Sequence, residues 1–280
     1  MIDLHTHSTA SDGSCSPERL VALSLAAGLS ALALTDHDTL DGVGRASRSA
    51  EGTGLRLLPG VEIEIACDSG EFHLLGLGLS GDTVRIGRAL ETMRSDRRER
   101  NRRMVEKFTR AGIPVTMEEL DEMAGGGVVS RAHFARLLIR KKVVGSVDAA
   151  FSRYIGKGKD FYEPRPYLAL EEATELIRSA GGIAVVAHPL SLGLRGSALR
   201  RAIAGYREQG VGGIEAWHPT HAVKDCRMLE RMAGGLGMAV TGGSDFHGEH
   251  LPQRKLGFTA GGCEVPDSFL DSVPLQRLQA

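Results

Sequence analysis

The 280-residue sequence contains little cysteine, few aromatic residues and no excess of either charge. Its 4 cysteines are scattered without a C-x-x-C pair, which excludes a disulfide framework and a zinc knuckle. The 34 Lys and Arg side chains nearly balance 35 Asp and Glu side chains, leaving a net charge of −1. No global basic field therefore points to a nucleic-acid coat or a membrane surface, and any anion site must be local.

Long apolar segments are also missing. The sequence has no run of about 18 apolar residues, and residues 1–5 lack the basic region and apolar stretch of a signal peptide. We therefore expect a cytoplasmic protein that has no membrane association and no obligate protein partner. With 42% hydrophobic residues, the chain can still bury a substantial core.

Glycine is abundant, with 36 residues, which suits the many tight turns between alternating strands and helices. Ser16 as N-cap, Pro17 at the first helical position and Gly28 beyond the end delimit one helix. Buried parallel strands are predicted by short apolar runs at residues 2–4, 31–34, 61–65, 72–79, 183–186, 213–216 and 238–241. The alternation predicts an α/β protein built on a parallel sheet or barrel with right-handed crossovers.

The middle of the chain interrupts this alternation. A long charged helical pattern comes first, Thr116 and Glu119 form a capping box for a second helix, and Ser130 suits the N-cap of a third. Strand patterns do not occur in this stretch. We therefore predict a small helical insertion at residues 92–164, within a domain formed by residues 1–91 and 165–280.

Histidines and carboxylates gather where predicted strands end. His5 and His7 occupy alternate positions of an extended strand, so both imidazoles can face one metal ion, although two polar strand-end histidines are the alternative. Asp36, His37 and Asp38 directly follow the next strand. The two aspartates among them suit either metal binding or turn formation.

One carboxylate lies inside an apolar run. Glu62 stands between Val61 and Ile63, and a buried carboxylate needs a metal ion or an arginine as partner. Glu64 has the same local pattern and is the competing choice. His73 also lies within an apolar run, where a hydrogen-bonded core histidine is the alternative to a ligand.

Three further candidates, His188, Asp245 and His247, follow later strands. In a parallel barrel the strand ends converge on one face, where such folds place their active sites. All the candidates together offer more nitrogen and oxygen ligands than one ion requires. We therefore expect more than one metal ion, held across a shared carboxylate and suited to phosphoryl displacement.

Five segments resemble the successive motifs of the polymerase and histidinol phosphatase (PHP) superfamily. They are DLHTHS at residues 3–8, TDHD at 35–38, GVE at 60–62, AHP at 187–189 and SDFH at 244–247. The match spans nearly the whole chain, and it implies a distorted (β/α)7 barrel and a metal-dependent phosphoesterase that hydrolyses phosphoric monoesters.

The resemblance also implies a trinuclear metal centre. By this resemblance, the first ion takes His5, His7, Glu62 and Asp245, the second takes Glu62, His73 and His188, and the third takes Asp12, His37 and His247. Asp12 stands where other branches of the superfamily place histidine. We expect two or three divalent ions, with Mn²⁺ first and zinc or iron as alternatives, because mixed imidazole and carboxylate ligands suit all three.

Within the superfamily, residues 130–135 and 215–221 are most similar to a stand-alone bacterial group that removes the 3′-phosphate from nucleoside 3′,5′-bisphosphates. This similarity implies a small nucleotide substrate, such as adenosine 3′,5′-bisphosphate, and an insertion that acts as a lid. The alternatives are a 5′-to-3′ exoribonuclease acting on short single-stranded RNA, to which group members have been linked, and a histidinol-phosphate-type phosphatase.

The arginine-rich residues 94–103 are interpreted as a solvated helix face, with an RNA-tracking surface as the alternative.

Four residues are candidates for substrate contacts. Ser130 and Arg131 suit a second phosphate, because a helix N-terminus presents free N–H groups and arginine binds phosphate through two hydrogen bonds. A simple N-cap with a surface arginine is the alternative. His218 and His221 follow a predicted strand and either bind substrate and protonate the leaving oxygen or stabilise a turn. Asp245 is a candidate to accept a proton from the attacking water.

Overall fold

The computed structural model describes residues 1–67, 70–125 and 127–273. Contacts divide the chain into two compact units. We call Met1–Ala89 with Tyr167–Ala280 the barrel unit and Leu90–Pro166 the helical unit. Among the described residues, no helix combines the length and the apolar character needed to cross a membrane.

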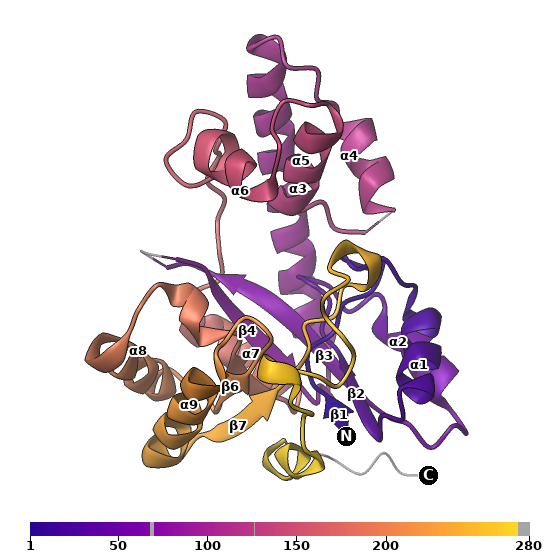
Figure 1. Ribbon diagram of the computed structural model, residues 1–280, viewed down its shortest axis with the longest axis vertical. Coiled ribbons are helices and arrows are strands. Elements are labelled where there is room, and N and C mark those ends of the chain that lie inside the picture. The colour runs from indigo at the N-terminus through magenta and orange to yellow at the C-terminus, as the bar shows by residue number, and fades with distance from the viewer. Residues whose placement is uncertain (68–69, 126, 274–280) are drawn as a thin grey trace. The chain divides into compact units, whose positions relative to one another are not determined.

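Seven strands lie side by side in their order along the chain (Figure 1). They are β1 (Ile2–Asp3), β2 (Ala31–Leu34), β3 (Arg56–Ile65), β4 (Phe72–Leu77), β5 (Ile183–Val186), β6 (Gly213–Trp217) and β7 (Ala239–Gly242). Beyond the ends of β1 and β7, the His7 N–H donates to the Phe246 carbonyl oxygen at 2.9 Å, so the sheet nearly closes on itself. The prediction of a seven-stranded α/β barrel is therefore confirmed.

One strand direction differs from the prediction. Strand β4 runs antiparallel to both β3 and β5, whereas the sequence pattern indicated parallel strands throughout. The reason is the connection between β3 and β4, which spans only residues 66–71, while a parallel crossover needs about a dozen residues or more. As a result, the amino end of β4 lies at the same barrel edge as the carboxyl ends of the other strands.

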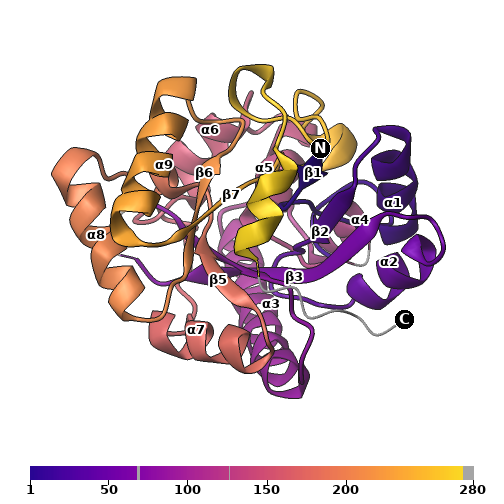
Figure 2. The same cartoon turned by 90° about the horizontal axis from the view of Figure 1, so that it is seen from below.

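Helices cover the outside of the barrel unit (Figure 2). They are α1 (Pro17–Ala26), α2 (Val43–Ala50), α7 (Leu170–Ser179), α8 (Gly196–Glu208) and α9 (Val223–Leu236). Short 3-10 turns follow at Pro189–Leu192, Gly248–His250, Ala260–Gly262 and Asp267–Ser272. Helix α1 begins as predicted: the Ser16 hydroxyl accepts from the Arg19 N–H at 3.2 Å, and Gly28 adopts a left-handed φ of 75° after the helix.

Apolar clusters of described residues hold the barrel unit together. Inside the barrel, Leu4, Leu58 and Leu75 pack closely and are at most 2% exposed. On the outer side of β2, Leu32 packs against Leu20 of α1. Each such leucine contributes roughly 1.5–3 kcal/mol through burial. The strands that carry the metal-site candidates are thereby fixed from both faces.

The helical unit has its own core. It contains most of α3 (Val84–Arg110), and also α4 (Met117–Ala124), α5 (Arg131–Arg140), α6 (Val147–Ala150) and the π-helical turn η1 (Phe151–Ile155). Phe108 of α3 and Phe134 of α5 are fully buried and stack with ring centres 6.1 Å apart. The predicted capping box is present, with Thr116 and Glu119 exchanging hydrogen bonds of 3.2 Å.

Candidate metal centre

The candidate ligands meet at one edge of the barrel unit because of where their strands end. His5 and His7 follow β1, His188 follows β5, and Asp245 follows β7. His188 and Asp245 have positive φ angles of 27° and 48°, which turn the chain sharply just after each strand. Gly243 provides the space for this arrangement, since a Cβ atom there would lie 2.4 Å from the His5 Cβ.

Glu62 lies at the centre of the site. Its Oε2 is 3.3 Å from His5 Nε2, 3.2 Å from His7 Nε2 and 3.2 Å from His37 Nδ1. Its Oε1 is 2.8 Å from His73 Nδ1 and 3.0 Å from His188 Nε2. One carboxylate that is 1% exposed thus contacts five imidazoles, which is the arrangement expected of a ligand shared by neighbouring ions.

Glu64, the competing choice, has a different environment. It is only half-buried, and its Oε1 accepts from the Tyr167 hydroxyl at 3.4 Å. It takes part in none of the His, Cys, Asp and Glu groups with metal-binding geometry among the described residues. Burial and geometry therefore both favour Glu62 over Glu64.

The first group with metal-binding geometry contains His5, His7 and Asp245, all buried. Asp245 Oδ1 lies 3.2 Å from His7 Nε2 and 3.5 Å from His5 Nε2. The same imidazole nitrogens face Glu62 Oε2. These contacts bring together the four residues of the first predicted set.

A second group contains His37, Glu62 and His73. Backbone hydrogen bonds place His37 beside Glu62, because the Glu62 N–H donates to the Asp36 carbonyl oxygen and the Asp38 N–H donates to the Glu62 carbonyl oxygen. His188 approaches the same carboxylate from β5, with Nε2 3.0 Å from Glu62 Oε1. This group therefore shares Glu62 and His73 with the second predicted set and adds His37, whereas His188 lies outside the group and contacts its carboxylate.

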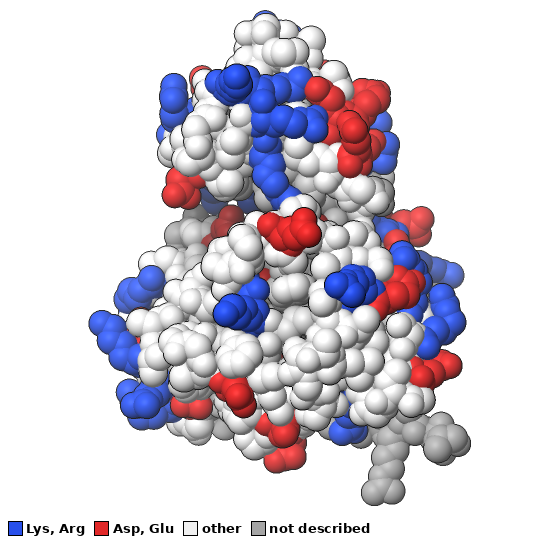
Figure 3. All heavy atoms as spheres, turned by 45° about the vertical axis from the view of Figure 1, so that its right-hand side comes forward, with Lys and Arg blue, Asp and Glu red and all other residues white. Residues whose placement is uncertain are grey.

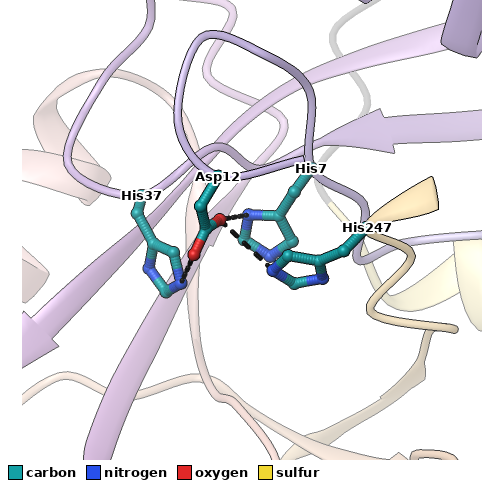
Figure 4. Close-up of side chains that lie close together, drawn as sticks. All are labelled: His7, Asp12, His37 and His247. Carbon is teal, nitrogen blue, oxygen red and sulfur yellow. Dashed lines mark ion pairs between the residues drawn. The ribbon is translucent and has the colours of Figure 1, made fainter. Parts of the chain in front are cut away.

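The remaining group joins His7, Asp12, His37 and His247 (Figure 4). Asp12 Oδ1 is 3.2 Å from His247 Nε2 and 3.8 Å from His7 Nδ1, and its Oδ2 is 4.0 Å from His37 Nε2. The sequence placed His7 with the first ion only, whereas here its ring also faces the third predicted set. His7 and His37 therefore each lie between two of the groups.

The electrostatics of these groups show a deficit of positive charge that metal ions would fill. Burial raises the pKa of Glu62, but the surrounding imidazoles of His37, His5 and His73 outweigh it and hold this pKa well below its usual range. Burial lowers the pKa of His7, but the adjacent carboxylates of Asp245 and Glu62 outweigh it and raise this pKa to about 10. Glu62 is therefore held as a carboxylate, the form that binds a metal ion.

Two buried atoms provide a further test of fit. Asp245 Oδ1 and His7 Nδ1 make no hydrogen bond with any described residue, and unsatisfied buried polar atoms are costly. Both atoms lie within groups that have metal-binding geometry. The donor set, made of imidazole nitrogens and carboxylate oxygens, suits Mn²⁺, Zn²⁺ and Fe²⁺. The residues therefore fit a centre with several metal ions.

Two residues beside the site were missed from the sequence. Glu215 of β6 is fully buried and accepts from His5 Nδ1 at 2.9 Å and from the His188 backbone N–H at 2.6 Å. Arg254 donates to the Asp245 carbonyl oxygen at 2.7 Å and also contacts the Asp245 carboxylate. Glu215 carried the same signal as Glu62, a carboxylate within a buried strand, whereas Arg254 has no pattern that would single it out.

Asp36 has a structural role. Its carboxylate accepts from the Ser8 N–H at 2.7 Å, the Ser8 hydroxyl at 2.7 Å and the Ser11 hydroxyl at 2.6 Å. These bonds fix the loop that carries Asp12. Of the two interpretations of Asp36, stabilisation of a turn is the one that the hydrogen bonds support.

His218 and His221 lie next to the centre with opposite hydrogen-bonding roles. His218 Nδ1 accepts from the Thr220 N–H at 3.2 Å, which leaves the proton on Nε2, 3.2 Å from Asp245 Oδ2. His221 Nδ1 lies 3.1 Å from the Ala216 carbonyl oxygen and must donate to it, which leaves Nε2 without a proton. Burial lowers the pKa of both histidines, that of His221 to about 4, so both imidazoles are neutral near pH 7.

Ser130 and Arg131 belong to the helical unit. Ser130 is the N-cap of α5, with its N–H donating to His133 Nδ1 at 2.9 Å. The Arg131 guanidinium carbon lies 5.7 Å from the centre of the Phe151 ring and 5.8 Å from that of Tyr162. Both features, an N-cap and an arginine held between aromatic rings, remain compatible with phosphate binding.

The barrel and its buried, multi-histidine edge define a metal-dependent phosphoesterase. Residues 3–189 match the PHP domain, and the chain belongs to the PHP domain family. The predicted superfamily is therefore confirmed.

Curated relatives match over most of their length. A 5′-3′ exoribonuclease of Haemophilus influenzae is 36% identical, over 88% of this chain and 89% of the relative. The 5′-3′ exoribonuclease Rnm of Escherichia coli is 33% identical, over 91% of this chain and 87% of the relative. A 3′,5′-nucleoside bisphosphate phosphatase of Chromobacterium violaceum is 32% identical, over 92% and 91%.

Solved structures share the fold. A Chromobacterium violaceum protein described as an amidohydrolase, with bound sulfate and no metal, aligns with a TM-score of 0.85 at 29% identity, over 97% of this chain and 96% of that one. A Bifidobacterium adolescentis protein described as a metal-dependent phosphoesterase aligns with a TM-score of 0.83 at 28% identity, over 96% of this chain and 94% of that one.

Proposed function

We propose that this protein hydrolyses the 3′-phosphate of nucleoside 3′,5′-bisphosphates, such as adenosine 3′,5′-bisphosphate, to give the 5′-monophosphate and phosphate. The observation that carries the proposal is Glu62, a single buried carboxylate in contact with five imidazoles. Such a set suits a centre that acts on a phosphoryl group. The bisphosphate phosphatase among the relatives supports the choice of substrate.

We further propose the metal ligands. One ion takes His5, His7, Glu62 and Asp245, a second takes Glu62, His73 and His188, and a third takes Asp12, His37 and His247, with His7 and His37 near enough to serve a neighbouring position. Mn²⁺ is the proposed ion, with zinc or iron as alternatives. When bound, these ions would neutralise the phosphoryl oxygens and activate water near neutral pH.

The protein residues then have separate tasks. Asp245 is proposed to accept the proton of the attacking water, because its carboxylate lies beside the histidines proposed to hold the first ion. His218 presents its Nε2 proton toward the site and can donate a hydrogen bond to the leaving 3′-oxygen. His221 presents an unprotonated Nε2, and its lowered pKa disfavours the charged form, so it suits hydrogen-bond acceptance rather than acid catalysis.

The other phosphate of the substrate is proposed to bind Ser130 and Arg131. Arg131→Ala should lower kcat/KM on adenosine 3′,5′-bisphosphate by about ten- to a hundred-fold, as expected for loss of a charged hydrogen bond worth about 1.5–3 kcal/mol. Hydrolysis of an aryl phosphate, which has no second phosphate, should be unchanged. Arg140→Ala, at the exposed other end of α5, is the matched control. Equal losses on both substrates would contradict the proposal.

The second candidate function is 5′-to-3′ exoribonuclease activity on short RNA, which the relatives from Haemophilus influenzae and Escherichia coli favour. A comparison of kcat/KM with Mn²⁺ present would separate the candidates, using adenosine 3′,5′-bisphosphate, a 5′-phosphorylated short RNA and histidinol phosphate. Preference for the bisphosphate supports the leading proposal, and preference for the RNA supports the second. Preference for histidinol phosphate would overturn both and leave the metal centre intact.

A further inference from the structure

The near-zero net charge of the chain conceals a strong local imbalance. Residues 90–130 of the helical unit carry eight Lys and Arg and eight Asp and Glu side chains. Residues 131–166 carry nine Lys and Arg and only three Asp and Glu side chains, a net charge of +6. In the first half, acidic residues within α3 and in the following α4 offset the arginines of α3, so the net positive charge of the unit lies in its second half.

The arginines of α3 are largely neutralised by neighbouring carboxylates. Arg102 pairs with Glu99 at 2.8 Å, and Arg110 pairs with Glu106 at 3.3 Å. These pairs are exposed and lie one helical turn apart, as in a solvated helix face. The α3 arginines are thus poor candidates for a polyanion-binding surface.

The second half of the unit combines positive charge with aromatic rings. Besides the contacts of Arg131 with Phe151 and Tyr162, the Arg153 guanidinium carbon lies 5.7 Å from the centre of the Tyr154 ring. The Tyr162 N–H donates to the Lys159 carbonyl oxygen at 2.9 Å, so the exposed Lys159 lies in a tight turn that ends at Tyr162. We call the surface formed by Arg131, Phe151, Arg153, Tyr154, Lys159 and Tyr162 the basic aromatic surface.

Figure 3 shows Lys and Arg side chains gathered over the helical unit, in the upper part of the view, beside a separate acidic patch. Proteins that bind single-stranded nucleic acid combine cations that contact phosphates with aromatic rings on which bases stack. An anionic membrane would instead require protruding apolar side chains. In the helical unit, Phe151 and Tyr154 pack against the core. Among the described residues of this unit, Val147 is the exposed large hydrophobic residue, which is too little apolar surface for a membrane.

We propose that the basic aromatic surface binds single-stranded RNA, through phosphate contacts of Arg153 and Lys159 and through base stacking on the half-buried rings. This inference rests on the phosphoesterase assignment and extends the proposed function to oligonucleotide substrates. A mononucleotide has too few phosphates and bases to use such a surface. Binding of RNA and hydrolysis of a bisphosphate should therefore respond to different substitutions.

The test is the double variant Arg153→Glu/Lys159→Glu in the purified, metal-containing protein. Its affinity for a 5′-phosphorylated, 3′-fluorescein-labelled oligouridylate of about ten nucleotides is measured by fluorescence anisotropy, with phosphorothioate linkages to prevent cleavage. Loss of two phosphate contacts should reduce the slope of log Kd against log salt by about 1.4. Wild type should accordingly lose about seven-fold more affinity than the variant between 50 and 200 mM salt.

The matched control is Arg102→Glu/Arg110→Glu, which makes the same change in net charge on the exposed face of α3. It should keep the wild-type salt slope within about 0.3. Unchanged RNA affinity in the first variant, or an equal loss in the control, would overturn the inference. Hydrolysis of adenosine 3′,5′-bisphosphate by both variants is measured in parallel and should equal wild type. Failure of wild type to hydrolyse it would count against the proposed function and not against this surface.

Discussion

Substitution of Glu215 by glutamine tests whether a residue that binds no ion itself controls the metal centre. Both Glu215 oxygens accept hydrogen bonds, one from His5 Nδ1 and the other from the His188 backbone N–H. Glutamine has the same shape but only one accepting oxygen, and its amide nitrogen can only donate. Glu215→Gln can therefore satisfy one of the two donors.

The cost depends on which contact the amide oxygen keeps. If it keeps the His188 N–H, the His5 Nδ1 must accept a hydrogen bond from the amide, and the His5 proton moves to Nε2, the nitrogen that faces Glu62. If it keeps His5, the buried His188 N–H faces an amide donor, at about 1–3 kcal/mol. Either outcome should weaken metal binding by roughly 10- to 100-fold, the range typical when partners of ligating histidines are removed.

Competition for Mn²⁺ against a fluorescent chelator measures this affinity directly, and circular dichroism checks that the variant folds. Thr241→Val is the matched control, because Thr241 pairs with Glu215 across β6 and β7, is fully buried, and its hydroxyl has no hydrogen-bond partner among the described residues. It should bind Mn²⁺ as wild type does. If folded Glu215→Gln bound Mn²⁺ as tightly as wild type, the positioning role assigned to Glu215 would be wrong.

Two further substitutions address the third ion and the pH dependence. Asp12→Ala should lower the bound metal by one ion per chain, because Asp12 belongs only to the group that contains His247. Elemental analysis after dialysis measures this number, and loss of all ions would contradict separate binding positions for the ions. His221 is buried with its pKa lowered to about 4, so the unfolded state binds more protons between pH 4 and about 6.5 and stability rises with pH there. Urea unfolding of the metal-free protein should show that His221→Gln removes roughly 3 kcal/mol of this rise, and an unchanged pH profile would refute the buried neutral state.

The sequence patterns identified elements whose signals are local. Strands β2 and β5 have the predicted bounds, and the capping box of Thr116 and Glu119 forms as expected. The nine predicted ligands lie at one barrel edge for the same reason, since each stands within or just after an apolar strand, or in the loop that follows β1. The alternation of side chains along a strand and the capping of a helix each depend on a few neighbouring residues. Both can therefore be predicted from the sequence without knowledge of the fold.

Contacts between distant segments needed the tertiary structure. The antiparallel direction of β4 depends on a short connection, and the direction of one strand cannot be read from its own apolar residues. The sharing of His7 between two groups, the link from Glu215 to both His5 and His188, and the approach of Arg254 to Asp245 join residues far apart in the chain. The sequence by itself determined which side chains can bind metal; the closed barrel decided which of them share an ion, because only the packing of strands sets the few ångströms between their ends.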